Sequence, residues 1–327
     1  MKKLITLLML LCATTAHAQL ATPEARSFAM GGAYGSRALG YEASFWNPAN
    51  LGLSNNPSWS AGANASAYFS NNALEYGDVT ALYGEYLDNA TKSALLADVR
   101  SNTNGGLATL NFDVGAQGLG ASFGRFAFGL GGIGAGNAEI TPDALELVLF
   151  GNVGEDGTGR NFDFSGTAVD LWTFYGAHAS YAQPFQFAAL PGTNFSAGIT
   201  APYGVAGDLA KVTEANSQLI YEPLSLDVDM QKLQSANGNA GSAFAADLGL
   251  AMEWQGRFVV GASMTNAIQV IDWDASAFEV TNYDISADYA DIAVASTTLA
   301  YDELDAAGQQ AIDGILNEAS LPRRLRF

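Results

Sequence analysis

The chain has few of the residues that cross-links, metal sites and membrane-spanning helices require. It contains a single cysteine, Cys12, and two histidines, so it offers neither a disulfide framework nor a thiolate metal site. No run of about 18 consecutive strongly apolar residues occurs beyond the first 20 positions, which excludes helical membrane spans there. We therefore expect a fold with no cross-link, no metal ion and no cofactor.

Basic residues are also scarce, and this limits the partners of the chain. Lysine and arginine number 14 against 33 aspartates and glutamates, for a formal net charge of −19. Binding to nucleic acid requires basic surface that displaces counterions, so nucleic acid is excluded as a partner. Adhesion to anionic lipid headgroups by charge is excluded on the same ground.

The first 18 residues have the order of a cleaved secretory leader. Lys2 and Lys3 form a charged start, Leu4–Ala13 an apolar segment, and Ala16-His17-Ala18 an A-x-A cleavage site. The apolar segment is too short to span a bilayer, so an uncleaved membrane anchor is the weaker alternative. Cleavage would leave Gln19 as the first mature residue.

Removal of the leader changes what the chain can do chemically. Leu11 stands before Cys12, where lipidation requires a small residue, so the cysteine is lost with the leader and the mature chain has none. The leader also takes two lysines and no acid, which leaves 12 basic against 33 acidic residues and a net charge of −21. One histidine remains, His178. With no motif around it, we assign it a structural role and predict no enzymatic activity.

Short alternating segments dominate the rest of the sequence. Within Gly120–Gly132, Phe126, Phe128 and Leu130 share one face while Arg125 lies on the other. Large apolar residues on one face and small or charged ones on the other are typical of a barrel wall with lipid outside, and Arg125 is predicted to face the lumen. A soluble β-sandwich, whose strands alternate in the same way, is the alternative.

Other segments repeat this alternation or interrupt it with helical signals. We predict strands at residues 107–119, 169–178, 194–204, 219–229, 241–255 and 257–274, the last two forming a hairpin about Gln255-Gly256. We predict helices at residues 88–99, 142–150 and 301–317, and a mobile glycine-rich loop at residues 152–161.

Directly behind the leader, a Gly-Gly turn and an Asn-Pro turn lie close together. Gly31 and Gly32 belong to the first, and Trp46 precedes Asn47-Pro48-Ala49 in the second. Such turns favour a compact segment over a strand or helix. The arrangement resembles the N-terminal hatch of FadL-type outer-membrane barrels, the long-chain fatty-acid transporters and their relatives. This resemblance implies hatch or gate roles for Gly31, Gly32, Trp46, Asn47, Pro48 and Ala49. We expect Asn47 to hydrogen-bond to the wall or to the hatch backbone, and the apolar residues of the segment to pack inside the barrel: Met30, Phe45, Trp46 and Leu51.

The resemblance extends along the chain, into a branch of FadL-like barrels known only as a domain of unknown function. Phe123–Phe128, Pro142–Asn152, Met264–Asn266 and Ile271–Trp273 carry it. It implies an all-β fold: an antiparallel transmembrane β-barrel of about 14 strands with short helices in its loops. The expected division is a leader (1–18), a lumenal hatch (19–56) and a barrel (57–327).

The last residues differ from the usual end of such a barrel. Leu321–Phe327 holds three arginines, and in the resembled branch a similar segment opens a further strand. Only about ten strands can be counted from alternation, fewer than the resemblance implies. We therefore expect a C-terminally truncated chain whose sheet is incompletely closed.

Two functions remain open from the sequence. The first is a channel in the outer membrane of a Gram-negative-type bacterium that passes hydrophobic small molecules, with the hatch as gate. The second is a non-transport scaffold in the same membrane that assists protein export or envelope assembly through partner proteins. Both place the barrel in outer-membrane lipid.

Overall fold

The computed structural model describes residues 25–30, 33–75, 77, 80, 87–214, 217–222, 224–236, 238–288, 292–321 and 323–326. The predicted leader and the hatch positions Gly31 and Gly32 lie outside these ranges. In the described part of the chain, no helix is both long enough and apolar enough to cross a membrane.

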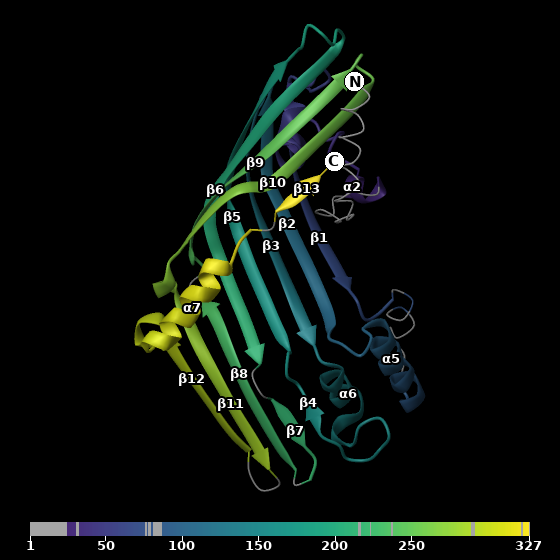
Figure 1. Cartoon of the computed structure of the whole chain (residues 1–327), viewed down its shortest axis with the longest axis vertical. Coiled ribbons are helices and arrows are strands. Elements are labelled where there is room, and N and C mark those ends of the chain that lie inside the picture. The colour runs from purple at the N-terminus through teal and green to yellow at the C-terminus, as the bar shows by residue number, and fades with distance from the viewer. Residues whose placement is uncertain are drawn as a thin grey trace.

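Antiparallel pairing joins the described strands into one sheet of 13 strands, longer than it is wide (Figure 1). The strands are β1 (Trp59–Asn71), β2 (Ala108–Phe123), β3 (Phe126–Ile140), β4 (Phe162–Asp163), β5 (Ala168–Phe185), β6 (Thr193–Glu214), β7 (Gln218–Ile220), β8 (Ser225–Ser235), β9 (Gly241–Trp254), β10 (Phe258–Trp273), β11 (Phe278–Asp288), β12 (Ile292–Ala300) and β13 (Arg324–Arg326). The predicted all-β, antiparallel fold class is thereby confirmed.

The sheet divides along β6 into two arms. Thr193–Ala206 of β6 pairs with β9, whereas Ala210–Glu214 pairs with β8. Between these stretches the backbone N–H of Ala240 donates to the carbonyls of Ala206 and Gly207. The connection from β8 to β9 therefore crosses from the lower arm to the upper arm at this point of β6. The upper arm continues from β9 through β10 to β13, and the lower arm from β8 through β11 to β12 (Figure 1).

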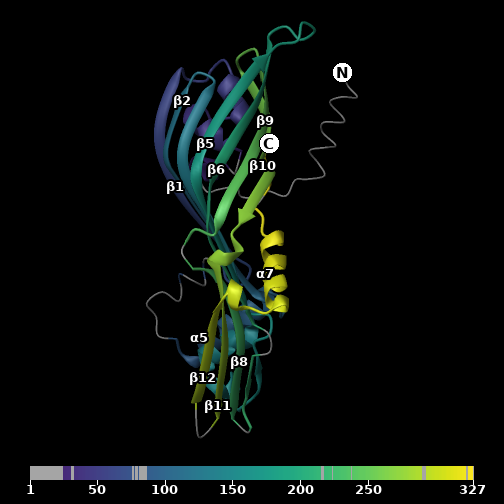
Figure 2. The same cartoon turned by 90° about the vertical axis from the view of Figure 1, so that its left-hand side faces the viewer.

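The described sheet has free edges. β1 pairs with β2, and β13 with β10, but no ladder among the described residues joins β1 to β10, β12 or β13. This agrees with the expectation of an incompletely closed sheet. In the upper arm the strands curve, so that one face is concave and the other convex (Figure 2).

Helices occupy the N-terminal segment, the lower loops and one position beside the sheet. They are α2 (Ala25–Ala29), α3 (Ala43–Trp46), α5 (Asn89–Asn102), α6 (Pro142–Phe150) and α7 (Ala306–Glu318), with 3-10 turns η1 (Gly40–Glu42), η2 (Pro48–Gly52), η3 (Gly151–Val153), η4 (Ala275–Ala277) and η5 (Tyr301–Glu303). Asp88, Thr141 and Asp305 cap α5, α6 and α7 by accepting from backbone N–H groups. The three predicted helices are therefore confirmed, although α7 starts at Ala306 because Asp305 caps it there.

The convex face carries exposed apolar side chains. Phe126, Phe128 and Leu130 of β3 are each at least half exposed, while Ala127 between them is fully buried. The predicted register of this strand is confirmed. Exposed aromatic residues also gather at the end of the sheet that holds the short turns 124–125 and 255–257, which we call the short-turn end. The strand register places these residues in one row across neighbouring strands: Trp59, Phe123, Phe126, Tyr181, Phe185, Trp254 and Phe258.

Two expectations need correction, and one hairpin was not predicted. Arg125 does not face inward from a strand, because Gly124 (φ +56°) and Arg125 form the turn between β2 and β3, where Arg125 is exposed. The predicted strand 219–229 is instead the hairpin β7–β8. The pair β11–β12 went unpredicted, because its alternating positions are filled by polar as well as apolar residues.

α7 packs where the two arms of the sheet meet. Ile312 and Leu316 of α7 join Leu209, Leu233 and Phe278 in one buried cluster, against which Trp172 and Trp273 also pack. Trp172 also lines the cavity below the N-terminal segment, so α7 and that segment occupy the same, concave face of the sheet. Burial of several large apolar side chains, each contributing about 1.5–3 kcal/mol, fixes α7 there.

Candidate functional site

Residues 33–56 lie against the concave face of the upper arm (Figure 2). We call residues 33–56 the hatch segment. Pro48 biases the preceding residue toward extended backbone, and Asn47 has φ −153° and ψ 101°. The Asn47 side chain then accepts from Ala49 N at 3.1 Å and caps η2. The Asn-Pro turn therefore ends one short helix and starts the next.

Asn47 also fastens the hatch segment to the sheet. Its Nδ2 donates to the carbonyl of Leu250 in β9 at 3.0 Å. Two glycines of the sheet face this side chain. A Cβ added at Gly249 would lie 2.1 Å from Asn47 Oδ1, and one added at Gly261 would lie 2.7 Å from Asn47 Nδ2. The expectation that Asn47 bonds to the wall or to the hatch backbone is confirmed, since it does both.

Glycines of the sheet create the space into which the hatch segment fits. A Cβ at Gly198 of β6 would lie 2.3 Å from both Pro48 C and Ala49 N. Cβ atoms at Gly62 and Gly120 would come within 2.6 Å and 2.8 Å of the Tyr41 ring. Gly62, Gly120, Gly198, Gly249 and Gly261 are here called the glycine cradle. Because the contacts at Gly198 are with backbone, any side chain there would displace the hatch segment.

Trp46 also anchors this turn. It is buried, and its ring meets Tyr34 edge-on at a centroid distance of 5.4 Å. Its carbonyl accepts from Ser263 Oγ of β10 at 2.6 Å. The Arg326 guanidinium of β13 lies 4.6 Å from the centre of the Trp46 ring and donates to the carbonyl of Phe45. β9, β10 and β13 therefore all hold this one turn.

His178 has a partner that the sequence did not reveal. Its Nε2 lies 3.1 Å from Ser44 Oγ, 134 positions earlier in the chain. Ser44 Oγ donates its one hydrogen to the carbonyl of Tyr41 at 2.6 Å, so Nε2 of His178 must be the donor to Ser44. A serine held this way is not prepared for nucleophilic attack. Thr200 Oγ1 also donates to the carbonyl of Ser44 at 2.9 Å, and the group fastens α3 to β5 and β6.

A buried carboxylate holds the end of the hatch segment. Glu253 of β9 is only 1% exposed, and it accepts from Ser54 N at 3.1 Å and Ser54 Oγ at 2.7 Å. Among the apolar hatch residues expected inside, Trp46 and Leu51 are buried and Phe45 is half-buried, but Met30 is 43% exposed. Met30 lies before the turns and outside the cradle, so its predicted burial was wrong.

Below the hatch segment lies a cavity of about 170 Å³, which we call the hatch cavity. Phe45 and Trp46 bound it on one side, and Trp172 and Phe174 of β5 on the sheet side. Its wall is mainly apolar, with the polar side chains of Asn64, Asp113, His178, Asp247 and Arg326 around it. An apolar site with a few convergent polar groups is the usual form of a small-molecule site.

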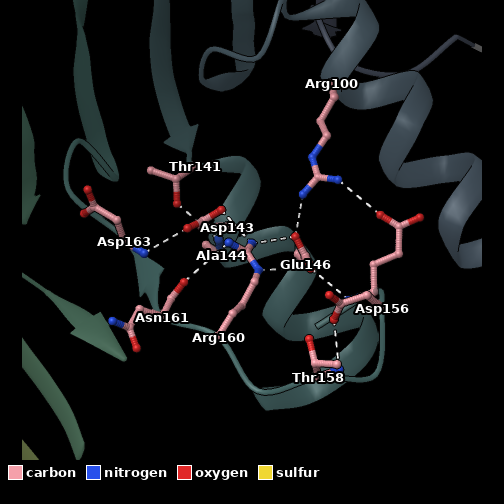
Figure 3. A network of polar contacts seen from close by, with 11 residues as sticks. Arg100, Thr141, Asp143, Ala144, Glu146, Asp156, Thr158, Arg160, Asn161 and Asp163 are labelled. Atoms are coloured by element: carbon pink, nitrogen blue, oxygen red, sulfur yellow. Dashed lines mark hydrogen bonds and ion pairs between the residues drawn. The ribbon is translucent and has the colours of Figure 1, made fainter. Parts of the chain in front are cut away.

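The opposite end of the molecule contains a charged network (Figure 3). Glu146 of α6 is 3% exposed and accepts from Arg100 of α5 and from Arg160, whose Nη2 lies 2.6 Å away. Arg160 also pairs with Asp143 at 2.8 Å, and Glu155 N donates to Glu146 at 2.9 Å. The loop predicted as mobile is thus tied to α6.

Electrostatics favour the ionised form of Glu146. Burial alone would raise the pKa of this carboxyl, but the hydrogen bonds from Arg160 and from Glu155 N, together with the charges of Arg160 and Arg100, lower that pKa below its ordinary value. The network is therefore a clamp between α5, α6 and the loop after it, and each of its strong donors is already used by a carboxylate.

The fold and the site define an all-β protein with an N-terminal segment seated on the concave face of its sheet. No protein-family model, no curated protein and no solved structure matches this chain. Within the described residues, no group of three or more His, Cys, Asp or Glu side chains is placed to hold a metal ion.

Sequence reasoning identified Trp46, Asn47, Pro48 and Ala49. The structure seats Asn47, Pro48 and Ala49 in the cradle and binds the carbonyl of Trp46 to Ser263 of β10. It missed the wall residues that receive them, chiefly Gly198, Gly249, Ser263 and Glu253. Strand glycines next to alternating apolar residues were the available signal, because glycine within a strand often marks the close approach of another backbone.

Proposed function

We propose that this protein is an outer-membrane β-barrel of the FadL-like kind, a channel for hydrophobic small molecules in which the hatch segment is the gate. The observation that carries the proposal is the seating of residues 41–54 on the concave face of a sheet whose convex face is apolar. A soluble protein would place its apolar strand face inside and its polar face outside, the reverse of what this upper arm has.

The aromatic residues at the short-turn end support a membrane location. Trp and Tyr concentrate at the boundaries of the bilayer, where their rings meet both apolar and polar surroundings. Trp59 and Trp254 lie in this row and are exposed by 67% and 46%, whereas Trp46 is only 3% exposed. Arg125 is exposed in the adjoining turn, where its charge stays at the polar boundary.

Tryptophan fluorescence in bilayers that contain brominated lipid tests this placement. Bromine quenches tryptophans that touch acyl chains, so we expect quenching of Trp59 and Trp254 in variants that retain only one of them, and none in a variant that retains only Trp46. Equal quenching of all three, or recovery of the protein as a soluble periplasmic monomer with an intact leader, would contradict the membrane proposal.

The gate role rests on where the hatch segment lies relative to the hatch cavity. Phe45 and Trp46 cover this cavity, and the turn after them depends on hydrogen bonds that water can replace. In the proposed mechanism an apolar molecule enters the cavity, and the Asn47-Pro48 turn shifts to let it leave. Deletion of residues 25–52 is expected to raise the leak of small polar solutes and to abolish selective uptake of apolar ones.

One observation favours the scaffold function instead. The hatch segment is attached to β1, β5, β6, β9, β10 and β13 by separate hydrogen bonds, a number that suits a permanent plug. A scaffold would retain its permeability after deletion of residues 25–52, provided that the variant still folds and reaches the membrane. That result would replace the channel with an outer-membrane protein that assists export or envelope assembly.

A further inference from the structure

A second cavity lies directly beyond the hatch cavity on the concave face. It encloses about 300 Å³ between the sheet and the end of α7, and Ile271, Trp273 and Ile315 contribute to its wall. We call it the α7 cavity. Asp170 and Lys211, whose charged atoms are 3.7 Å apart, lie at its rim.

The two cavities share three lining side chains: Trp172, Phe174 and Leu321. Trp172 and Phe174 point inward from adjacent inner-face positions of β5. Leu321 comes from the segment between α7 and β13, is 5% exposed, and packs with Phe174, Ala243 and Ala245. Where two cavities share a wall made of side chains, those side chains set the width of any passage between them.

Leu321 is held in this wall by one side chain. Gln269 of β10 donates from Nε2 to the Leu321 carbonyl at 3.1 Å, and its Oε1 accepts from Leu321 N at 2.7 Å. The backbone on either side is fixed by α7 and by the pairing of β13 with β10. Leu321 therefore belongs to a short strap whose two ends are secured and whose middle depends on Gln269.

We propose that Leu321 is a partition between two chambers of one apolar path and determines which molecules extend from the hatch cavity into the α7 cavity. The proposal rests on the channel function proposed above. The boundary between the chambers is formed by two aromatic rings and a tethered leucine, so the narrowest part of the path is apolar.

Straight-chain 1-bromoalkanes of increasing length provide the test. In the purified protein with Trp59, Trp254 and Trp273 replaced by Phe, the tryptophans left are Trp46 and Trp172, and bromine quenches them on binding. Affinity should rise about fourfold per methylene until the hatch cavity is full, and then level off. Detergent concentration is held constant, so that partition into micelles is the same for every variant.

The partition variants should move that limit. Leu321→Ala joins the chambers, so a chain two methylenes beyond the original limit should bind about 15-fold more tightly than it binds the parent protein. Gln269→Ala should move the limit in the same direction, and Leu321→Trp should move it to shorter chains. Leu321→Met, which conserves volume, and Leu316→Ala, which shortens a leucine of α7 outside both cavities, should leave it unchanged.

Three results would decide against the proposal. A limit that is the same in Leu321→Ala, Leu321→Trp and the parent protein would overturn the partition and leave the channel function standing. A limit that moves as much in Leu316→Ala would assign the effect to α7 as a whole. Absence of saturable quenching in every variant would instead overturn the apolar path itself, and the channel function with it.

Discussion

The hatch segment and α7 lie on the same concave face of the sheet but are held there by different interactions. The hatch segment is seated over glycines and held by hydrogen bonds between side chains and backbone, such as Asn47 to Leu250 and Ser263 to Trp46. α7 is held by apolar contacts of Ile312 and Leu316. Hydrogen bonds of this kind contribute about 0.5–1.5 kcal/mol each, because water can replace them.

This difference indicates which of the two segments can move when water reaches the concave face of the sheet. Release of the hatch segment exchanges hydrogen bonds with the sheet for hydrogen bonds with water and breaks small apolar contacts, such as those of Leu51 with Ala127 and Ala182. Release of α7 breaks a larger apolar cluster that includes Phe278 and two tryptophans, and each Å² of apolar surface so exposed costs about 25 cal/mol. The comparison assigns reversible motion to the hatch segment and a permanent structural role to α7. The predictions below test that assignment, starting with the largest expected effect.

Truncation of the α7 contacts should destabilise the whole fold. Ile312→Ala and Leu316→Ala each remove a buried aliphatic side chain, and about 2–5 kcal/mol of unfolding free energy is expected to be lost for each. Denaturant unfolding followed by circular dichroism measures the loss. Val148→Ala, at a position that is 81% exposed on α6, is the control and should change stability by less than ~0.5 kcal/mol. An equally small effect at Ile312 would show that α7 is not part of the core.

A side chain in the glycine cradle should release the hatch segment and leave the sheet intact. Gly198→Val forces atoms against the backbone of Pro48 and Ala49, at a cost of about 1–3 kcal/mol to the docked state. Limited proteolysis should then cut within residues 33–56 while the strands stay protected. Gly134→Val is the control, because a Cβ there meets the end of the Thr173 side chain at 3.3 Å. Release by both variants would show that the cradle is not specific.

Prediction from sequence succeeded where the pattern is local and failed where the partner is distant. Caps and turns depend on neighbouring residues, so the helices at 88–99 and 142–150 and the hairpin about Gln255-Gly256 could be predicted. The alternation of large and small residues in β3 correctly predicted which side chains are exposed and which are buried. The seat of Asn47 could not be predicted, because it depends on a backbone 203 positions away and on glycines with no side-chain signal.

Substitution of Asn47 should loosen the hatch segment without releasing it. Asn47→Ala removes both the cap of η2 and the bond to Leu250, for a loss of about 1–2 kcal/mol. Asn47→Asp keeps an acceptor for Ala49 N but loses the donor, so it separates the two contributions. Amide hydrogen exchange of residues 44–52 is the measurement. Unchanged protection in both variants would contradict the central role of this turn.

Acidification should affect the opposite end of the molecule first. The pKa of Glu146 is lowered in the folded state, so its contribution to stability is complete above the ordinary glutamate pKa and is lost as pH falls through the lowered value. The protection factors of amides in α6 and residues 151–161, which compare observed exchange with the intrinsic rate at the same pH, should therefore fall as the pH drops below the ordinary glutamate pKa. Glu146→Gln should give the lower protection factors already at neutral pH and show no further loss on acidification. A pH response that persists in that variant would assign the effect to another group.

A reversible cross-link across the cradle tests the gate most directly. A Cβ at Gly52, the last residue of η2, would lie 3.0 Å from Ser196 Cβ of β6, so Gly52→Cys with Ser196→Cys can form a disulfide after a small shift. The expected mature chain has no other cysteine, which makes each single-cysteine variant a clean control. Uptake of an apolar fluorescent probe by cells that carry the double variant is measured before and after reduction. The gate account predicts uptake that is blocked when oxidised and restored when reduced, whereas equal uptake in both states would contradict it.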